Sequence, residues 1–134
     1  MRKTKKVLLF AVILVVLGSF LASMFHTSFF QVKVKEIEFE TERGTLSGLL
    51  YMPKGAGEEE PRPVIVTTHG YLNTKEMQDA SAIEMSRRGY IVLAVDMYDH
   101  GDSRWKDEIK VGEQFATFWI YSQIDAANYM AGQD

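Results

Sequence analysis

The residues of this 134-residue chain that could do chemistry gather in two short polar segments. The first, HGY at residues 69–71, follows an apolar strand-like run that begins at residues 64–66. The second, DMYDHGDS at residues 96–103, follows the apolar run at residues 90–95. Continuous apolar runs of this kind are typical of strands covered on both faces in a parallel sheet. Because open α/β sheets bind ligands at the carboxyl ends of such strands, we expect both polar segments at one edge of the sheet.

The segment at residues 69–71 has the composition of an anion-binding turn. Gly70 allows a sharp turn at the end of a strand, which leaves backbone N–H groups free to point at a negative charge. The functional interpretation is half of an oxyanion hole, in which the Tyr71 N–H stabilises the oxygen of a tetrahedral intermediate. The alternative is an ordinary strand-to-loop turn with a structural histidine, and the local residues leave both open.

The second segment can be interpreted as a metal site or as a polar turn. The candidate ligands are His69, Asp96, Asp99, His100 and Asp102. Imidazole and carboxylate groups bind divalent metals, and such a set would make the protein a metal-dependent hydrolase. However, the spacing fits no specific metal motif, and a single local loop rarely surrounds an ion. We therefore predict no metal site and no cofactor, and interpret the segment as a tight turn whose Asp and Ser side chains bond their own backbone.

Ser103 is the one residue of this turn that could be proposed as a nucleophile. A nucleophilic serine needs a base within hydrogen-bond reach, and no histidine follows His100 in the chain. The surrounding residues GDSRW do not form the G-x-S-x-G pattern, and no strand leads directly into them. We therefore assign no nucleophile among the 134 residues.

The amino terminus has the pattern of a membrane-spanning helix. A basic head at residues 1–6, with four Lys or Arg residues, precedes 19 uncharged residues at 7–25. As a helix, this run is about 28 Å long, which is close to the hydrocarbon thickness of a bilayer. The positive-inside rule places the head in the cytoplasm, so we expect a single-pass signal-anchor in the cell membrane and an extracytoplasmic remainder.

A cleaved signal peptide and a buried helix of a soluble protein are the two alternatives. A signal peptide needs a shorter apolar core and a small-x-small cleavage site, but Phe20 and Leu21 occupy the first small position for cleavage after Ala22 or Ser23. Four flanking cations and uniform apolarity argue against a buried amphipathic helix.

Composition and charge narrow the remaining functions. The chain is ordinary for a folded protein, with 46% hydrophobic and 25% charged residues, and has room for one small domain. It has no cysteine, which excludes disulfides, thiol nucleophiles and thiolate metal sites. Four of the 15 basic residues lie within the first 25 residues, so the remainder has a net charge of −7. An acidic body of this kind binds nucleic acid poorly, so we expect no nucleic-acid partner.

Two strands are expected before the parallel part of the fold. After a short linker at residues 26–31, apolar and polar residues alternate over 32–40, with a slip near Lys35 and Glu36 that would fit a bulge. A second strand over residues 46–53 would form an antiparallel hairpin with the first. Residues 54–63, which include Glu58, Glu59 and Glu60, are expected to be a solvated loop.

Two helices are expected in the rest of the chain. Asn73 or Thr74 can cap a helix that runs to about Arg88 and ends at Gly89, so strand, helix and strand form a right-handed crossover. Its expected buried residues are Met77, Ala80 and Ile83. A longer amphipathic helix is predicted over residues 111–130. Its expected core residues are Phe115, Phe118, Trp119, Ser122, Ala126, Tyr129 and Met130.

Taken together, these motifs resemble the α/β-hydrolase superfamily, and most of all bacterial membrane-linked esterases and serine aminopeptidases. The resemblance covers residues 32–134, and the motifs that carry it are GTLSGLLYMP, PVIVTTHGY, SRRGYIVLAVDMYDHGDS and the helix ending in DAANYMAGQD. It implies an α/β fold, in which an antiparallel start leads into parallel strands with helices, behind the transmembrane helix. Tyr71 matches the family's oxyanion-hole position, His69 and Gly70 match the residues that shape that loop, and residues 96–103 match a structural turn beside the pocket.

The sequence departs from the family pattern in two places. Asp99 stands where the family usually has glycine, which would be costly if the position needs a positive φ. The family's nucleophile elbow, with G-x-S-x-G, and its Asp and His partners have no counterpart here. We therefore expect residues 32–134 to be the front of a serine hydrolase for small ester or amide substrates, inactive alone. The alternative is a short anchored interaction protein that pairs through an open sheet edge.

Overall fold

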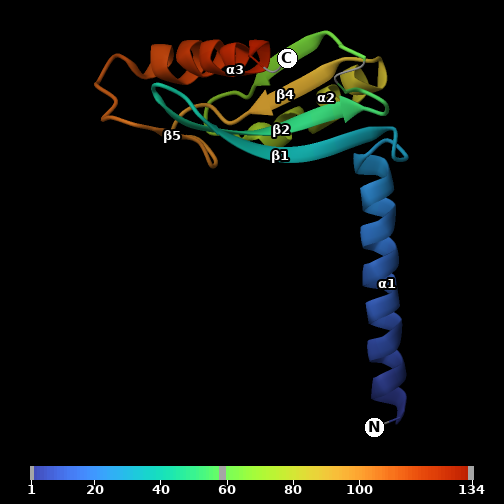
Figure 1. Cartoon of the computed structure of the whole chain (residues 1–134). Coiled ribbons are helices and arrows are strands. Elements are labelled where there is room, and N and C mark those ends of the chain that lie inside the picture. Colours follow the sequence, from blue (N-terminus) through green and yellow to red (C-terminus); the bar gives the residue numbers. More distant parts are fainter. Residues whose placement is uncertain (1, 58–59, 133–134) are drawn as a thin grey trace.

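The computed structural model describes residues 2–57 and 60–132, and it consists of one long helix and an α/β domain (Figure 1). The helix, α1 (Arg2–His26), projects away from the domain at the start of the first strand. The strands are β1 (Val32–Glu40), β2 (Gly44–Pro53), β3 (Val64–Thr68), β4 (Ile91–Val95) and the short β5 (Arg104–Trp105). Two of the three Glu residues of the expected solvated loop, Glu58 and Glu59, and the last two residues of the expected domain lie outside the described residues.

The sheet has the mixed topology that the sequence predicts. Its strand order is β1-β2-β4-β3. The β1–β2 and β2–β4 pairs are antiparallel, and the β4–β3 pair is parallel. Two apolar clusters lie on its opposite faces, one beneath each helix layer. β3 is an edge strand of the described sheet, and β5, which the sequence did not predict, pairs with the start of β2.

The first strand contains no bulge, so that expectation is wrong. β1 pairs with β2 in one unbroken register from Val32 opposite Pro53 to Glu40 opposite Thr45. The apolar residues switch from even-numbered to odd-numbered positions along the strand because a different face of the sheet is covered at each end. Val32 and Val34 pack in the cluster beneath α2, and Ile37 and Phe39 pack in the cluster beneath α3. Successive side chains of a strand point to opposite faces, so the apparent slip records a change of covering helix.

The predicted crossover helix is present but is built in two parts. A 3-10 turn, η1 (Lys75–Gln78), starts after Thr74 and leads into α2 (Asp79–Arg87), and Gly89 at φ +99° follows the helix end. The predicted buried face is wrong at Met77 and Ala80, which are exposed, whereas Ile83 is half-buried and packs against the core. The fully buried residues are Lys75, Ala82 and Ser86. The 3-10 turn changes the angular spacing from that of an α-helix, and this rotates α2 relative to a continuous-helix projection.

The last helix starts later than predicted and contains a π-helical segment. This segment, η2 (Ala116–Tyr121), precedes α3 (Ser122–Ala131), and the expected first residue, Val111, is 97% exposed. A π-helix adds a residue to the local turn, so the face that meets the sheet shifts within it. Thr117, Ser122 and Ala126 are buried as a result, whereas Phe115 is exposed.

The linker between α1 and the sheet is a tight, hydrogen-bonded elbow, residues 27–31. Ser28, Phe29 and Phe30 have φ values of +49°, +58° and +62°, and this run turns the chain sharply out of the helix. The Val32 N–H donates to the Thr27 carbonyl at 2.9 Å, and the Lys54 N–H donates to the Gln31 carbonyl at 2.8 Å. His26 also lies 3.5 Å from Asp79 at the start of α2, so helix and domain are joined at several points.

Candidate active site

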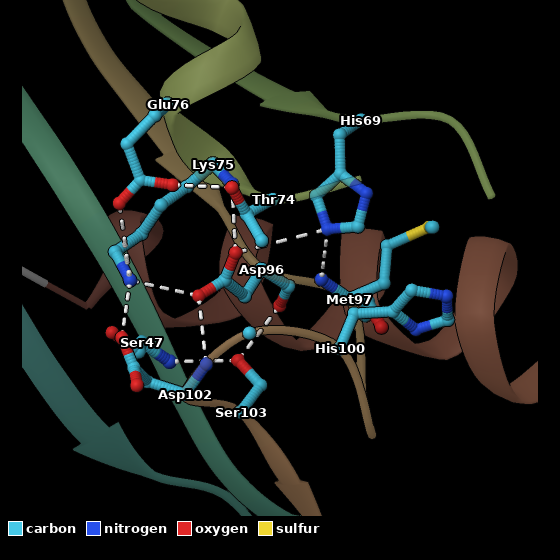
Figure 2. Close-up of polar contacts among 12 residues, drawn as sticks. Ser47, His69, Thr74, Lys75, Glu76, Asp96, Met97, His100, Asp102 and Ser103 are labelled. Atoms are coloured by element: carbon cyan, nitrogen blue, oxygen red, sulfur yellow. Dashed lines mark hydrogen bonds and ion pairs between the residues drawn. The ribbon is translucent and has the colours of Figure 1, made fainter. Parts of the chain in front are cut away.

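The two polar segments lie side by side at the carboxyl ends of β3 and β4. Parallel pairing of these strands puts Thr68 opposite Val95, so His69 and Asp96 leave the sheet at the same level. Figure 2 shows the His69 ring and the Asp96 carboxylate from these two strand ends pointing toward one another, with Lys75 on the other side of Asp96. The expectation that residues 69–71 and 96–103 meet at one edge is therefore confirmed.

Asp96 is the centre of the polar contacts at this edge. Its carboxylate is fully buried and accepts hydrogen bonds from the Lys75 N–H at 2.7 Å, the Lys75 ammonium at 2.8 Å and the Asp102 N–H at 3.0 Å. A buried carboxylate is tolerated only when it is paired and hydrogen-bonded in this way. The carboxylate thus holds the loop after β3 and the turn after β4 in a fixed relation.

Lys75 supplies the positive charge of this cluster. Its side chain is 2% exposed, and its Nζ lies 2.7 Å from Asp102 and 3.7 Å from both Glu36 and Glu76. Burial by itself would lower the pKa of the ammonium group, but hydrogen bonds to Asp102 and Asp96 outweigh it, so the pKa of Lys75 is raised. The same contact lowers the pKa of the Asp102 carboxyl. Lys75 is therefore a permanent cation between the two segments at neutral pH.

Ser103 has a structural role in the same turn. Its hydroxyl is fully buried, donates to the Asp96 carbonyl at 2.8 Å and accepts the Ser47 N–H at 2.9 Å. A hydroxyl with both capacities used and no exposure to a ligand cannot act as a nucleophile in this conformation. Ser103 thus bonds the backbone of its own turn, as expected for a tight polar turn.

Two residues of the turn adopt left-handed backbone conformations. Asp99 has φ +55°, and its side chain accepts the Trp105 N–H at 3.0 Å, which gives this unusual position a local hydrogen bond. Aspartate is among the few non-glycine residues that accept such a conformation at modest cost. Gly101 has φ +51°, and a Cβ there would overlap the Asp96 carboxylate. The departure at Asp99 is thus accommodated, and Gly101 is needed both for its φ and for its size.

His69 connects the loop to the neighbouring strand. Its ring is buried, its Nε2 accepts the Met97 N–H at 3.1 Å, and its Nδ1 lies 2.7 Å from the Gly70 carbonyl. Because Nε2 accepts a hydrogen bond, the proton is on Nδ1 and the ring is neutral. The distance of 3.8 Å between Nε2 and the Asp96 carboxylate is therefore not an ion pair. The ring fixes the start of the loop that Gly70 and Tyr71 continue.

The Tyr71 N–H lies in the loop that follows the carboxyl end of β3. Within the described residues it donates no hydrogen bond to the protein, and the next residue, Leu72, has φ +59°. Backbone that enters the left-handed region in this way can direct neighbouring N–H groups into a concave anion site. The Tyr71 ring itself is 60% exposed. The oxyanion role of Tyr71, and the shaping roles of His69 and Gly70, stay predictions.

An aromatic cluster adjoins this loop on the outside. The Tyr71 ring centroid lies 5.6 Å from that of His100, 6.3 Å from Phe118 and 6.1 Å from Trp119. Phe118 and Trp119 were expected in the core beneath the helix, but η2 presents them against Tyr71 in the candidate site. The result is an aromatic cluster around the Tyr71 ring.

The histidines come together without forming a metal site in the described part of the chain. The rings of His69 and His100 are 5.3 Å apart, and the His100 Nδ1 lies 3.0 Å from the Tyr98 carbonyl. Asp96 and Asp102 bind the Lys75 ammonium, and Asp99 binds the Trp105 N–H. No group of three His, Asp or Glu side chains among the described residues is arranged to hold a metal ion.

Lys75 is the site residue that sequence reasoning missed. The available signal was an imbalance of charge, because the turn at residues 96–103 contains three aspartates and no lysine or arginine. Buried acids need a cation, and Lys75 lies at the start of the helix that follows the HGY loop.

A cavity of about 420 Å³ lies elsewhere in the domain, at the amino ends of β3 and β4 beside Tyr129, and none of the site residues lines it.

Comparisons with known proteins identify the fold. No family model and no curated protein sequence matches the chain. Among solved structures, it is similar to a hypothetical protein from Pseudomonas aeruginosa, with 24% identity and a TM-score of 0.61 over 76% of this chain and 31% of that one. It is also similar to the thioesterase domain from the curacin biosynthetic pathway (19% identity, TM-score 0.55, 73% of this chain and 33% of that one). A third match is naproxen esterase, a carboxylesterase from Bacillus subtilis (17% identity, TM-score 0.55, 84% and 36%).

These matches extend over most of the described domain but only part of each neighbour. The chain spans about a third of the length of the solved structures it matches. The chain therefore has the fold of the α/β-hydrolase superfamily over that third.

Proposed function

We propose that residues 32–134 form the front of a serine hydrolase that acts on ester or amide bonds, and that the chain alone does not turn over substrate. In this proposal the Tyr71 N–H is one donor of the oxyanion hole, and His69 and Gly70 hold its loop. In this proposal the serine, its histidine base and the acid partner are supplied by residues other than the 134 of this sequence. A serine attacks the carbonyl carbon, and the N–H donors stabilise the oxygen that becomes negative.

The observation that carries this proposal is the Tyr71 N–H after the carboxyl end of β3, which donates to no group among the residues that the structure describes. It lies beside a loop that three interactions fix: the His69 ring on Met97, the Lys75 N–H on Asp96 and the Lys75 ammonium on Asp96. A donor that is held in place before the reaction has no reorganisation cost when charge develops on the substrate. The Tyr71 ring also contacts Phe118 and Trp119, and an apolar neighbourhood of this kind would strengthen such a hydrogen bond.

We further propose that α1 anchors this domain in the cell membrane with its amino terminus in the cytoplasm. Residues Lys3–His26 form a helix that contains an 18-residue window with a mean hydropathy of 2.7, so it is long and apolar enough to cross a membrane. None of its apolar window is buried in the protein, which distinguishes it from the core helix of a soluble domain. The basic head supports the proposed orientation, with the domain outside.

The first test compares reactivity with a fluorophosphonate probe, which labels activated serines. The isolated chain is expected to give no labelling, whereas a polypeptide that also carries the serine elbow is expected to react. Reading the DNA downstream of codon 134, in all frames, tests the same proposal independently. Absence of a G-x-S-x-G sequence followed by Asp and His, together with labelling of the isolated chain, would reject it.

The role of Tyr71 can be tested with a pair of substitutions that separates its N–H from its ring. Tyr71→Pro removes the donor, and Tyr71→Ala removes the ring but keeps the donor. In the active, serine-bearing form we expect Tyr71→Pro to lower kcat by roughly 100-fold to 1000-fold with little change in KM, as loss of one oxyanion donor does. Tyr71→Ala should retain most of kcat. Equal loss in both variants would show that the ring, not the N–H, matters.

A second candidate function is favoured by the position of β3. Within the described sheet β3 pairs only with β4, and Val64 is 42% exposed. An edge strand with β-branched residues can accept another strand, so an anchored protein could bind a partner by adding to the sheet. Protection of the residue 64–68 amides from hydrogen exchange in the isolated chain at low concentration would count against this use, because an unpaired edge exchanges quickly.

A further inference from the structure

A shallow groove lies where the elbow meets the domain, far from the candidate active site. Its volume is about 460 Å³, and its walls include Thr27, Phe30, Val32, Met52, Lys33 and Lys54. The elbow and the ends of β1 and β2 build it together, and the figure of the whole chain places this junction at the end of α1 (Figure 1). The groove is thus at the depth where α1 would leave the hydrocarbon layer.

The apolar wall of the groove is continuous with the surface of α1. Phe30 is 56% exposed, and its ring lies 6.4 Å, centroid to centroid, from that of Phe20 on α1. The left-handed conformation at Phe30 turns this side chain back toward the helix. An acyl chain that lies along α1 would therefore meet Phe30 and reach the groove without crossing a polar surface.

The polar rim of the groove is basic, in contrast to the rest of the domain. Lys33 and Lys54 are both exposed, and neither makes an ion pair with any residue that the structure describes. The first acidic residue of β1 is Glu36, beyond the groove, although the residues after the first 25 have a net charge of −7. Two exposed lysines beside an apolar wall form a pattern that complements a lipid with an anionic headgroup.

We propose that this groove binds one anionic glycerophospholipid of the outer leaflet. Its phosphate would lie between Lys33 and Lys54, and one acyl chain would lie on Phe30 and the upper part of α1. The elbow that forms the groove is fixed by hydrogen bonds on both sides, so the lipid would hold the domain at a set height over the bilayer. This inference rests on the proposed anchoring of α1 and is independent of the hydrolase chemistry.

The test uses the full chain in vesicles and nanodiscs of phosphatidylcholine that contain a minor fraction of phosphatidylglycerol. Flotation with pure phosphatidylcholine vesicles reports anchoring by α1. Native mass spectrometry of chain released from nanodiscs reports the lipids retained, and the phosphatidylglycerol enrichment is their ratio divided by that of the bulk. We expect enrichment in the unmodified chain, and a loss of roughly tenfold or more in Lys33→Gln/Lys54→Gln, since each lysine near a membrane surface contributes about fivefold.

Two matched controls separate the groove from general effects. Lys106→Gln/Lys110→Gln removes the same charge from exposed positions outside the groove and should keep the enrichment. Phe30→Ser should lower lipid retention, whereas Phe29→Ser, at a neighbouring exposed residue that does not line the groove, should not. The lysine pair is on the surface, so its substitution leaves the fold intact.

The outcomes distinguish this inference from the anchoring on which it rests. Flotation with enrichment that depends on Lys33 and Lys54 supports it. Flotation without enrichment, or equal loss in both lysine pairs, overturns the lipid site and leaves the anchor standing. Failure to float overturns the anchor and the lipid site together.

Discussion

At the scale of single residues, the Lys75 ammonium is the one positive charge that reaches the Asp96 carboxylate among the described residues. It also binds Asp102, so one side chain connects the loop after β3 to the turn after β4. Burial of an ion pair is not itself a large source of stability, but removing one partner leaves the other charge buried and unpaired. Loss of Lys75 should therefore lower the free energy of unfolding by more than the intact ion pair contributes to it.

We expect Lys75→Met to lower the free energy of unfolding by about 3–5 kcal/mol at neutral pH, as breaking a buried pair does. Lys110→Met, on the exposed loop, should change it by less than about 0.5 kcal/mol. Urea titration in detergent micelles, followed by the fluorescence of Trp105 and Trp119, measures both. A loss as small as that of the control would show that Asp96 is satisfied without the ammonium.

The same cluster predicts how stability depends on pH. The pKa of Asp102 is lowered by its hydrogen bond to Lys75, so its contribution is present above the ordinary carboxyl pKa of about 3.9 and is lost as pH falls through the lower folded value. The pKa of Lys75 is raised, so its contribution persists through the alkaline range to above about pH 10. For each protein, the loss of unfolding free energy on going from about pH 7 to between pH 5 and pH 3 can be measured. This loss should be smaller for Lys75→Met than for the unmodified chain.

Gly101 gives a second prediction at this scale. Gly101→Ala places a methyl group on the Asp96 carboxylate at φ +51°, whereas Gly112→Ala, at φ +94°, meets no atom within 4 Å. Both carry the cost of a left-handed residue, about 1–2 kcal/mol. Only Gly101→Ala must also displace the buried carboxylate, so it should be less stable than Gly112→Ala by at least about 1 kcal/mol, a typical cost of overpacking. Equal unfolding midpoints would contradict the packing around Asp96.

At the scale of elements, two buried serines, one on a helix and one in a turn, should change the unfolding free energy in opposite directions when each is replaced by alanine. Ser86 on α2 is fully buried, and within the described residues its hydroxyl has no hydrogen-bond partner. Ser103 in the turn after β4 uses its hydroxyl twice, with the Ser47 N–H and the Asp96 carbonyl. The same change, serine to alanine, removes an unsatisfied group from the helix and a needed partner from the turn.

We expect Ser86→Ala to leave the unfolding free energy unchanged or to raise it by about 1 kcal/mol, because a buried polar group without a partner is lost. Ser103→Ala should lower it by about 1–3 kcal/mol, because the Ser47 N–H is left buried without an acceptor. Thermal unfolding followed by circular dichroism measures the pair side by side. A destabilised Ser86→Ala would indicate that this hydroxyl binds an ordered water.

The elements differ in how well the sequence predicts them. The runs that became β3 and β4 are apolar on both faces, a pattern that depends little on the neighbours, and Gly89 marks the end of α2 by its φ. The face switch of β1 needs knowledge of which helix covers each end, and the same alternation had suggested a bulge. Similarly, η2 arises from packing that hydrophobic spacing does not reveal, so Phe115 was wrongly placed in the core.

The candidate site was predictable in position but not in detail. Gly70 after an apolar run indicates a turn at a strand end, and the register of β3 with β4 brings it beside Asp96. The charge that connects the two segments comes from Lys75 in a third segment, 21 residues before Asp96. Contacts of this separation depend on the crossover of the whole unit, which single-residue properties do not encode.

At the scale of the whole molecule, the proposed topology can be tested with single cysteines, because the chain contains none. Asp107→Cys lies on an exposed loop of the domain, and Lys5→Cys lies in the basic head of α1. In intact cells, an impermeant maleimide should label Asp107→Cys and should label Lys5→Cys only after the membrane is opened. The reverse pattern would place the domain in the cytoplasm, and labelling of both in intact cells would exclude a single span.

The elbow has a mechanical consequence for the site. The strand β1 begins beside α1, and the Asp96 N–H bonds the carbonyl of Ser47, which pairs with Glu38 six residues along β1. At about 3.3 Å per residue, this puts the site roughly 20 Å to the side of the helix axis. With α1 spanning a membrane, rotation of that helix about its own axis would move the site along a circle parallel to the membrane, at a constant height above it. Material diffusing within the plane of the bilayer would then meet the site from the side, whichever way the anchor faces.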